Sequence, residues 1–151
     1  MFMVDSRSRS LLAQMDWKGQ RVHLLKPMQY MNLSGVPVST LANFFKIATA
    51  DILVAHDELD FAPGVVKLKQ GGGHGGHNGL RDICAKLGSN EFARVRLGIG
   101  HPGNRDAVVN YVLDHPTPVE RELISGALEK AVEYLPQIIG GQLDEAMNAL
   151  H

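Results

Sequence analysis

The sequence predicts an α/β layered fold with at least one antiparallel strand. Two observations predict it: short strand-like runs alternate along the chain with segments of helical periodicity, and a turn signal separates two of the strand-like runs. The 151 residues are enough for one domain with its own core, and we treat residues 1–151 as that single domain. An apolar fraction of 44% and a charged fraction of 21% are ordinary for a globular protein and argue against disorder.

The first elements lie in the N-terminal third. Residues 21–26 are typical of a short strand. A helix is predicted from Ser34, a suitable N-cap residue, because Val38 and Leu41 begin an apolar stripe at helical spacing. The run 52–55 is short, apolar and rich in β-branched residues, which indicates a strand buried on both faces.

The middle of the chain predicts a strand, a helix and a further strand. Residues 61–64 form a turn signal and lead into a half-exposed strand over 65–69, which must be the antiparallel one. The apolar positions of 80–87 share one helical face, and Gly88 suits the C-cap of that helix. Polar and apolar residues then alternate over 94–99, as in a strand.

The C-terminal part predicts helices. A short helix is expected over 105–113. Thr117 as N-cap, a proline after it and Glu120 at the third helical position form a strong helix start. Pro136 should limit that helix, and a last helix is expected over 143–150.

Cysteine content and segment hydropathy predict a cytoplasmic protein. The one cysteine, Cys84, excludes an intramolecular disulfide, fits a reducing compartment and lies on an apolar helix face, as a packed thiol would. No signal-peptide core is seen at the N-terminus, and no run approaches the length of a membrane span. We therefore expect no membrane association.

Three segments hold the residues that could carry chemistry. They are Tyr-Met-Asn-Leu-Ser-Gly at 30–35, His-Asp-Glu-Leu-Asp at 56–60 and a glycine-rich block at 71–79. Each follows a predicted strand. Because ligands bind beyond the carboxyl ends of strands in open α/β sheets, we expect the three segments to meet at one edge.

Asp57 is the first candidate catalytic residue. It directly follows a buried strand, where a carboxylate can accept a hydrogen bond from a histidine and so orient that histidine as a general base. The alternative is that Asp57 or Asp60 only caps a loop.

The glycine block predicts a ligand-facing loop. Five of the six residues 71–76 are glycine, and neither a Walker loop nor a dinucleotide fingerprint is present. Such a loop lets backbone amides approach a ligand, and it ends near Asn78 at a helix N-terminus, which favours anions. The alternative is a flexible surface loop.

His74 and His77 raise the possibility of a metal-dependent hydrolase. The His-x-x-His spacing is a weak signal, since nothing fixes the distance to His56, Asp57 or His101. We therefore predict no metal site.

The formal net charge of −1 hides an uneven distribution. Residues 63–105 hold seven basic and two acidic side chains, whereas residues 106–151 hold two basic and eight acidic ones. Lys67 and Lys69 share one strand face, as do Arg94 and Arg96. If these strands are neighbours, four cations share a surface suited to phosphates; the alternative is an ordinary solvated strand face.

Four segments resemble bacterial peptidyl-tRNA hydrolase in sequence, order and spacing. Besides 30–35 and 56–60 they are Gly-Gly-Gly-His-Gly-Gly-His-Asn-Gly-Leu at 71–80 and Arg-Leu-Gly-Ile-Gly-His-Pro-Gly at 96–103. The resemblance runs from about residue 20 to the C-terminus, with Gln29 where the family usually has threonine.

The resemblance implies a fold and an activity. The fold would be a twisted, mixed, mostly parallel sheet with helices on both faces. The activity would be hydrolysis of the ester bond that joins a peptide to the 3′-terminal ribose of tRNA, which frees the tRNA for reuse. The partner would be peptidyl-tRNA, the protein a monomer, and no metal or cofactor would be needed.

The resemblance also implies roles for individual residues. Asp57 would orient the general base, and Asn32 would bind substrate and help to position the attacking water. The other implied contacts are with the tRNA end, the peptide or the tRNA phosphates: Tyr30, Asn78 and His77 in the cleft, and Lys69, Arg96 and Lys67 on phosphate.

One family segment is expected to be missing. The family begins with a strand, a Gly-Asn-Pro-Gly turn and a Thr-Arg-His-Asn segment whose histidine is the base, and this chain would start some three dozen residues into that pattern. The chain alone would then be inactive. The rival function is a module that binds tRNA or RNA ends and has lost catalysis.

Overall fold

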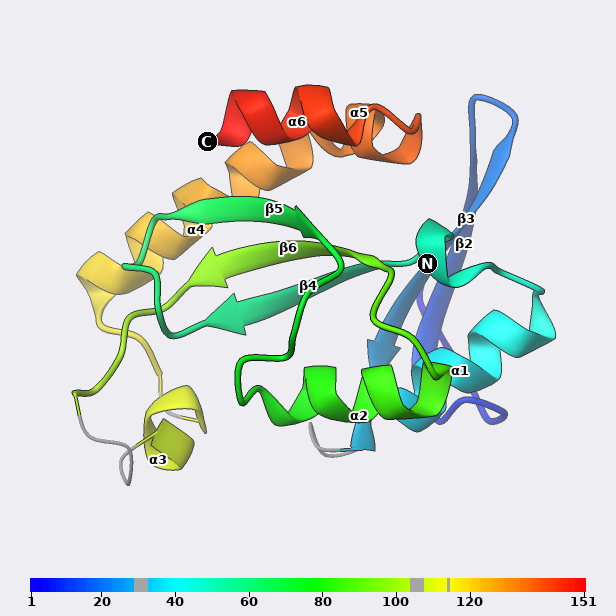
Figure 1. Cartoon of the computed structure of the whole chain (residues 1–151), viewed down its shortest axis with the longest axis horizontal. Helices are drawn as coiled ribbons and strands as arrows, with labels where there is room; N and C mark the ends of the chain where they lie inside the picture. Colours follow the sequence, from blue (N-terminus) through cyan, green and yellow to red (C-terminus); the bar gives the residue numbers. More distant parts are fainter. Residues whose placement is uncertain (29–32, 104–107, 114) are drawn as a thin grey trace. The chain divides into compact units, whose positions relative to one another are not determined.

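The computed structural model describes residues 1–28, 33–103, 108–113 and 115–151, although not the side chain of residue 109 (Figure 1). These residues form two compact units. Unit 1 comprises Met1–Ile52 and Gly71–Phe92, and unit 2 comprises Leu53–Gln70 and Ala93–His151. That the whole chain is one domain stays a prediction.

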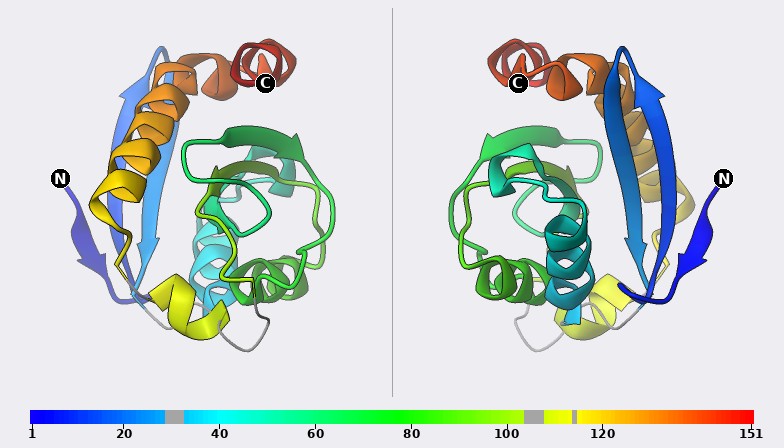
Figure 2. Two further views of the ribbon diagram at one scale, coloured as in Figure 1. Left: turned by 90° about the vertical axis from the view of Figure 1, so that its left-hand side faces the viewer. Right: turned by 90° about the vertical axis from the view of Figure 1, so that its right-hand side faces the viewer.

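Unit 1 is built on an antiparallel sheet in the order β1-β2-β3, of which Figure 2 shows β2 and β3 as a long two-stranded ribbon. The strands are β1 (Met3–Asp5), β2 (Ser10–Trp17) and β3 (Gln20–Pro27). Lys18 and Gly19 join β2 to β3, both with positive φ (47° and 83°), as the tightest hairpin turns require. Only β3 is predicted from the sequence.

The helices of unit 1 pack through a close backbone contact. They are α1 (Gly35–Phe44), the 3₁₀ turn η2 (Thr49–Asp51) and α2 (Asn78–Leu87). A Cβ at Gly35 would lie 2.3 Å from the carbonyl oxygen of Asp82, so only glycine allows this approach of α1 to α2. Gly88 ends α2 in the left-handed conformation with φ of 71°, which confirms the predicted cap.

The sheet of unit 2 has the order β4-β6-β5. Its strands are β4 (Leu53–Glu58), β5 (Val66–Gln70) and β6 (Ala93–Gly98). The β4 and β6 strands run parallel, while β5 runs antiparallel to β6 after the predicted turn, as the arrows in Figure 1 show. The α/β class and the mixed sheet are thus confirmed.

The proportion of parallel pairing is smaller than predicted. Among the described strands, β4–β6 is the one parallel pair, and the other three pairs are antiparallel. The physical reason lies in unit 1, where β1, β2 and β3 follow one another through short connections that can join only antiparallel neighbours. The expectation of a mostly parallel sheet is therefore wrong for the described strands.

Four described helices follow β6. They are α3 (Val108–Leu113), α4 (Pro118–Glu133), α5 (Leu135–Ile139) and α6 (Leu143–Leu150). The capping box before α4 is confirmed: Glu120 N donates to Thr117 Oγ1 at 3.2 Å and Thr117 N donates to Glu120 Oε1 at 2.9 Å. Pro136 lies in the first turn of α5, where a proline is tolerated.

The core of unit 2 lies between its sheet and the helices α4 and α6. Its buried side chains are Val66 and Leu68 of β5, Val95 of β6 and, from the helices, Ala127, Ala131, Ala146 and Leu150. Leu68 is completely buried. Successive residues of a strand point to opposite faces, so the residues between these apolar positions lie on the face away from α4 and α6.

Along the described ranges, no helix combines the length and the apolar character that crossing a membrane requires.

Candidate active site and nucleic-acid interface

Asp57 lies near the carboxyl end of β4, opposite Leu97 of β6 in the parallel ladder. Its side chain is half-buried. Strand alternation places it on the same face as Leu97, which packs against the core of unit 2. The neighbouring His56 points to the other face, so the two side chains belong to different sides of one strand.

His56 is buried and both of its ring nitrogens are engaged. Its Nδ1 lies 2.8 Å from the main-chain carbonyl oxygen of Asp57. Its Nε2 lies 3.3 Å from Nε of Arg94, which is also buried. Sequence reasoning considered His56 only as a possible metal ligand and missed these contacts, because the pairing of β4 with β6 is not visible in local sequence.

The predicted cluster of cations exists. In the β5–β6 ladder Lys67 stands opposite Arg96 and Lys69 opposite Arg94, on the face away from α4 and α6. We call these four residues the cationic face. Arg94 is buried against His56, whereas the other three are half-buried and form no ion pair with a described carboxylate. The strands β5 and β6 are neighbours, which was the condition for this cluster.

Phe61 contacts two of these cations. Its ring lies 5.0 Å from Lys67 Nζ and 5.1 Å from the guanidinium carbon of Arg96. The Arg96 Nε atom is buried and has no hydrogen-bond acceptor within the described ranges. Sequence reasoning missed Phe61, and the signal that could have found it is an aromatic residue in a turn next to a cationic strand.

Gly98 explains how the Phe61 loop lies so close to the sheet. A Cβ at this position would stand 2.2 Å from the carbonyl oxygen of Ala62 and 2.8 Å from the Phe61 side chain. Glycine at the end of β6 therefore lets the loop pass directly over the strand.

His151 lies close enough to Lys67 and Arg96 for their charges to affect its pKa. Its Nε2 accepts a hydrogen bond from Leu68 N at 3.0 Å, at the outer edge of β5. Burial, and then the charges of Lys67 and Arg96, lower the pKa of His151 below its ordinary value of 6.5. The neutral imidazole is the form that can accept this bond.

The two histidines of the glycine block bond to the backbone of their own loop. His77 Nδ1 accepts from Leu80 N at 3.2 Å and so caps α2, and His74 Nδ1 accepts from Gly76 N at 3.0 Å. Gly75 and Gly76 have positive φ. Wherever side chains are described, no group of three or more His, Cys, Asp or Glu could hold a metal ion.

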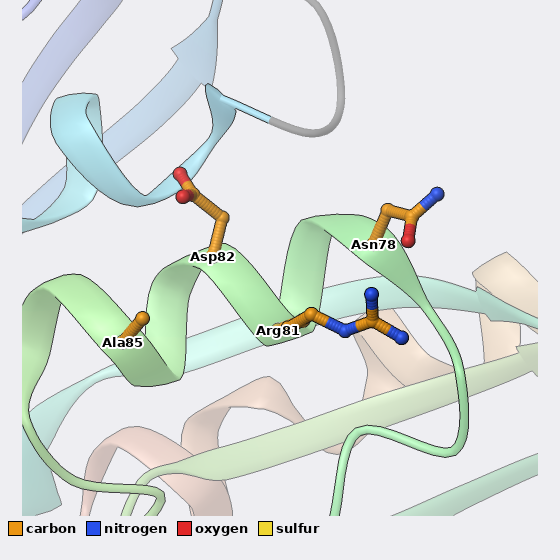
Figure 3. A pocket seen from close by; sticks show the side chains of 4 residues that line it. All are labelled: Asn78, Arg81, Asp82 and Ala85. Carbon is orange, nitrogen blue, oxygen red and sulfur yellow. The ribbon is translucent and has the colours of Figure 1, made fainter.

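A surface hollow of about 390 Å³ lies along the start of α2 and is lined by Asn78, Arg81, Asp82 and Ala85 (Figure 3). The Asp82 side chain points toward the start of α1, where its Oδ2 accepts a hydrogen bond from Gly35 N at 2.7 Å. Arg81, which the sequence analysis did not single out, places a cation three residues after Asn78, one turn along the helix.

The carboxyl ends of β4 and β5 do not lie at the same edge of their sheet. Because β5 is antiparallel to β6, and β6 is parallel to β4, the carboxyl end of β5 lies at the opposite end of the sheet from that of β4. The expectation that the segments after β4 and β5 begin at one shared edge of the sheet is therefore wrong. Tyr30 and Asn32 lie outside the described residues.

These observations define a class: an α/β protein with a carboxylate on a sheet strand, a cationic sheet face and a glycine-rich loop before a helix N-terminus. Comparison with known proteins makes it specific. The profile of the family described as peptidyl-tRNA hydrolase matches residues 2–151, and the chain belongs to this family.

Relatives and solved structures agree. The peptidyl-tRNA hydrolase of Methylococcus capsulatus is 55% identical over 130 residues, which are 86% of this chain and 70% of the relative. That of Delftia acidovorans is 50% identical over 150 residues, or 99% and 72% of the two chains. The crystal structure of peptidyl-tRNA hydrolase from Acinetobacter baumannii has a TM-score of 0.96 at 43% identity and covers 99% of this chain and 76% of its own. The chain is thus an enzyme of the hydrolase class.

One expectation needs correction. The match begins at residue 2, so the resemblance does not start at about residue 20. Residues 2–19 contain none of the four motif segments on which the resemblance rests. The matched parts are 70% of the Methylococcus capsulatus relative and 72% of the Delftia acidovorans relative, so the expectations of a missing family segment and of an inactive chain stay predictions.

Proposed function

We propose that this chain hydrolyses the ester bond between the peptide and the 3′-terminal ribose of peptidyl-tRNA. One observation carries the proposal within the family: the β5–β6 register sets Lys67 opposite Arg96 on one face of the β4-β6-β5 sheet, and Asp57 lies near the end of β4 on the other face of the same sheet.

The RNA side of the proposal rests on the cationic face. Lys67, Lys69 and Arg96 would bind tRNA phosphates, because they are not neutralised by described carboxylates and cations paired with phosphate release condensed counterions. The acidic helices α4 and α6 occupy the opposite face of the sheet, where they do not compete for phosphate. Asn78 and His77 would contact the tRNA end or the peptide near the start of α2, beside Arg81.

The chemical side rests on Asp57 and Asn32. Asp57 would accept a hydrogen bond from the general base, which removes a proton from water. The water oxygen attacks the ester carbonyl, the bond from that carbon to the ribose 3′-oxygen breaks, and the leaving oxygen takes up the proton. Asn32 would hold the water and Tyr30 the substrate end. We assign the base to no residue of this chain, and the scheme needs neither metal nor cofactor.

The decisive experiment is cleavage of an N-acetylated aminoacyl-tRNA by the purified chain. Release of the acetylated amino acid well above the uncatalysed rate, unchanged by a chelator, is expected. Asp57→Asn should lower kcat by about 100-fold or more with little change in KM, as for an interaction made only in the transition state. Asp60→Asn is the matched control and should behave as the unchanged chain.

Two other outcomes of the cleavage experiment would favour one of the alternative functions. Binding of tRNA without cleavage would favour the RNA-end-binding module. Loss of activity in chelator would favour a metal-dependent hydrolase.

We also propose that the protein is a monomer in solution and that it lies in the cytoplasm, where peptidyl-tRNA arises. Sedimentation tests the oligomeric state, and cell fractionation tests the location.

A further inference from the structure

We propose that His56 is a positioning residue that holds the main chain at Asp57 in one neutral tautomer, selected by Arg94. The inference concerns a buried side chain to which the proposed reaction gives no role. It rests on the proposed function only for what Asp57 does.

The tautomer follows from the two partners of the ring. An arginine Nε carries a hydrogen and can only donate, so His56 Nε2, 3.3 Å away, must present its lone pair. The proton of the neutral ring is then on Nδ1. A carbonyl oxygen can only accept, and Nδ1 accordingly donates to the Asp57 carbonyl at 2.8 Å. Both hydrogen bonds therefore require the tautomer with its proton on Nδ1. Neither bond can form in the tautomer with its proton on Nε2.

Arg94 also disfavours protonation of the ring. An imidazolium would place a second N–H at Nε2 against the Arg94 Nε–H, and two cations would then be buried side by side. His56 therefore has no free nitrogen toward Arg94 or toward the Asp57 carbonyl with which to activate water. This geometry favours a positioning role over the role of a base.

The hydrogen bond constrains the residue from which the candidate carboxylate projects. Glu58 O accepts from Ile99 N, on the side of β4 that faces β6. Successive carbonyls of a strand point to opposite sides, so the Asp57 carbonyl points away from β6. The bond from His56 Nδ1 to that carbonyl closes a small ring through the main-chain torsions of residues 56 and 57, and it thereby fixes the direction of the Asp57 side chain.

Two substitutions separate positioning from packing. His56→Leu removes both hydrogen bonds, whereas His56→Asn keeps an N–H donor close to the position of Nδ1. We expect His56→Leu to lower kcat about 10–100-fold at nearly constant KM, as for residues that orient a catalytic group. His56→Asn should recover most of that loss. A wild-type kcat in His56→Leu, or an Asn variant as slow as the Leu variant, would overturn the inference.

A spectroscopic measurement is independent of activity. The ¹⁵N shifts of the His56 ring at neutral pH should show a protonated Nδ1 and an unprotonated Nε2, and Arg94→Met should abolish this single tautomer. A protonated Nε2 in the unchanged chain contradicts the inference whether or not the chain cleaves tRNA, and remains decisive if His56→Leu does not fold. If the chain has no hydrolase activity while the spectrum is as expected, the proposed function fails and the tautomer stands.

Discussion

The two faces of the β4-β6-β5 sheet differ although they are built from the same strands. One face presents Val66, Leu68 and Val95 to the helices α4 and α6. The other presents Lys67, Lys69, Arg96 and the buried pair of His56 with Arg94. One step along the chain separates a residue whose burial stabilises the fold from a residue suited to an anionic ligand.

The largest effect is expected on the apolar face. Leu68→Ala empties a completely buried position, and such changes cost about 2–5 kcal/mol of unfolding free energy. Urea unfolding followed by circular dichroism measures it. The folded fraction should still bind tRNA with unchanged salt dependence; a changed salt slope would mean that the two faces are not independent.

The next effect is expected on the cationic face. Replacing Lys69 and Arg96 together by alanine should weaken tRNA binding and lower the slope of log K against log salt by about one for each lost phosphate contact. Stability should change little, because both side chains are half-buried and without ion pairs to described carboxylates. Lys130→Ala with Arg121→Ala, which removes the same two charges from α4, is the control; equal effects in both would place the RNA elsewhere.

A smaller effect is expected at Phe61. Phe61→Leu keeps an apolar side chain but removes the ring that lies 5.0 Å from Lys67 Nζ and 5.1 Å from the Arg96 guanidinium carbon. A cation–π contact at a partly exposed site is worth about 0.5–1 kcal/mol, so tRNA affinity should fall by roughly 2–5-fold. The salt slope should stay constant, since no charge is removed. A changed slope in fluorescence anisotropy would contradict a purely orienting role.

The smallest effect concerns pH. The lowered pKa of His151 means that the folded chain binds this proton less readily than the unfolded chain does. The stabilisation is therefore complete above the ordinary pKa of 6.5 and is lost as pH falls through and below it. The protection factor of the Leu68 amide, which is the exchange rate in the unfolded chain divided by that in the folded chain at the same pH, should fall in that direction, and His151→Ala should remove this pH dependence of the protection factor.

Local rules predicted those elements whose signals lie within one turn or strand. Thr117 and Glu120 mark the start of α4 with a capping box, and Gly88 marks the end of α2. The shared face of Lys67 and Arg96 was predicted on the condition that their two strands are neighbours. The alternation of side chains along each strand gives the face, but the sequence does not show which strands pair.

Other features depend on partners distant in the chain. The β2 strand has adjacent Leu11 and Leu12 and is stabilised by its antiparallel pairing with β3, so its own sequence gave little indication. The prediction of one shared edge was wrong because β5 runs antiparallel to β6, so its carboxyl end lies at the opposite end of the sheet from that of β4. His77 was missed as a cap because histidine is outside the usual set of N-cap residues.

The alternation of β5 has a consequence for how this enzyme can change over time. If the proposed function holds, substitutions at positions 67 and 69 should alter affinity for an anionic partner, while those at 66 and 68 should alter the packing of the core. A saturation library scored separately for folding and for RNA binding would give two interleaved patterns of tolerance with a period of two residues. Natural variation can then tune binding along a strand without an intermediate that fails to fold.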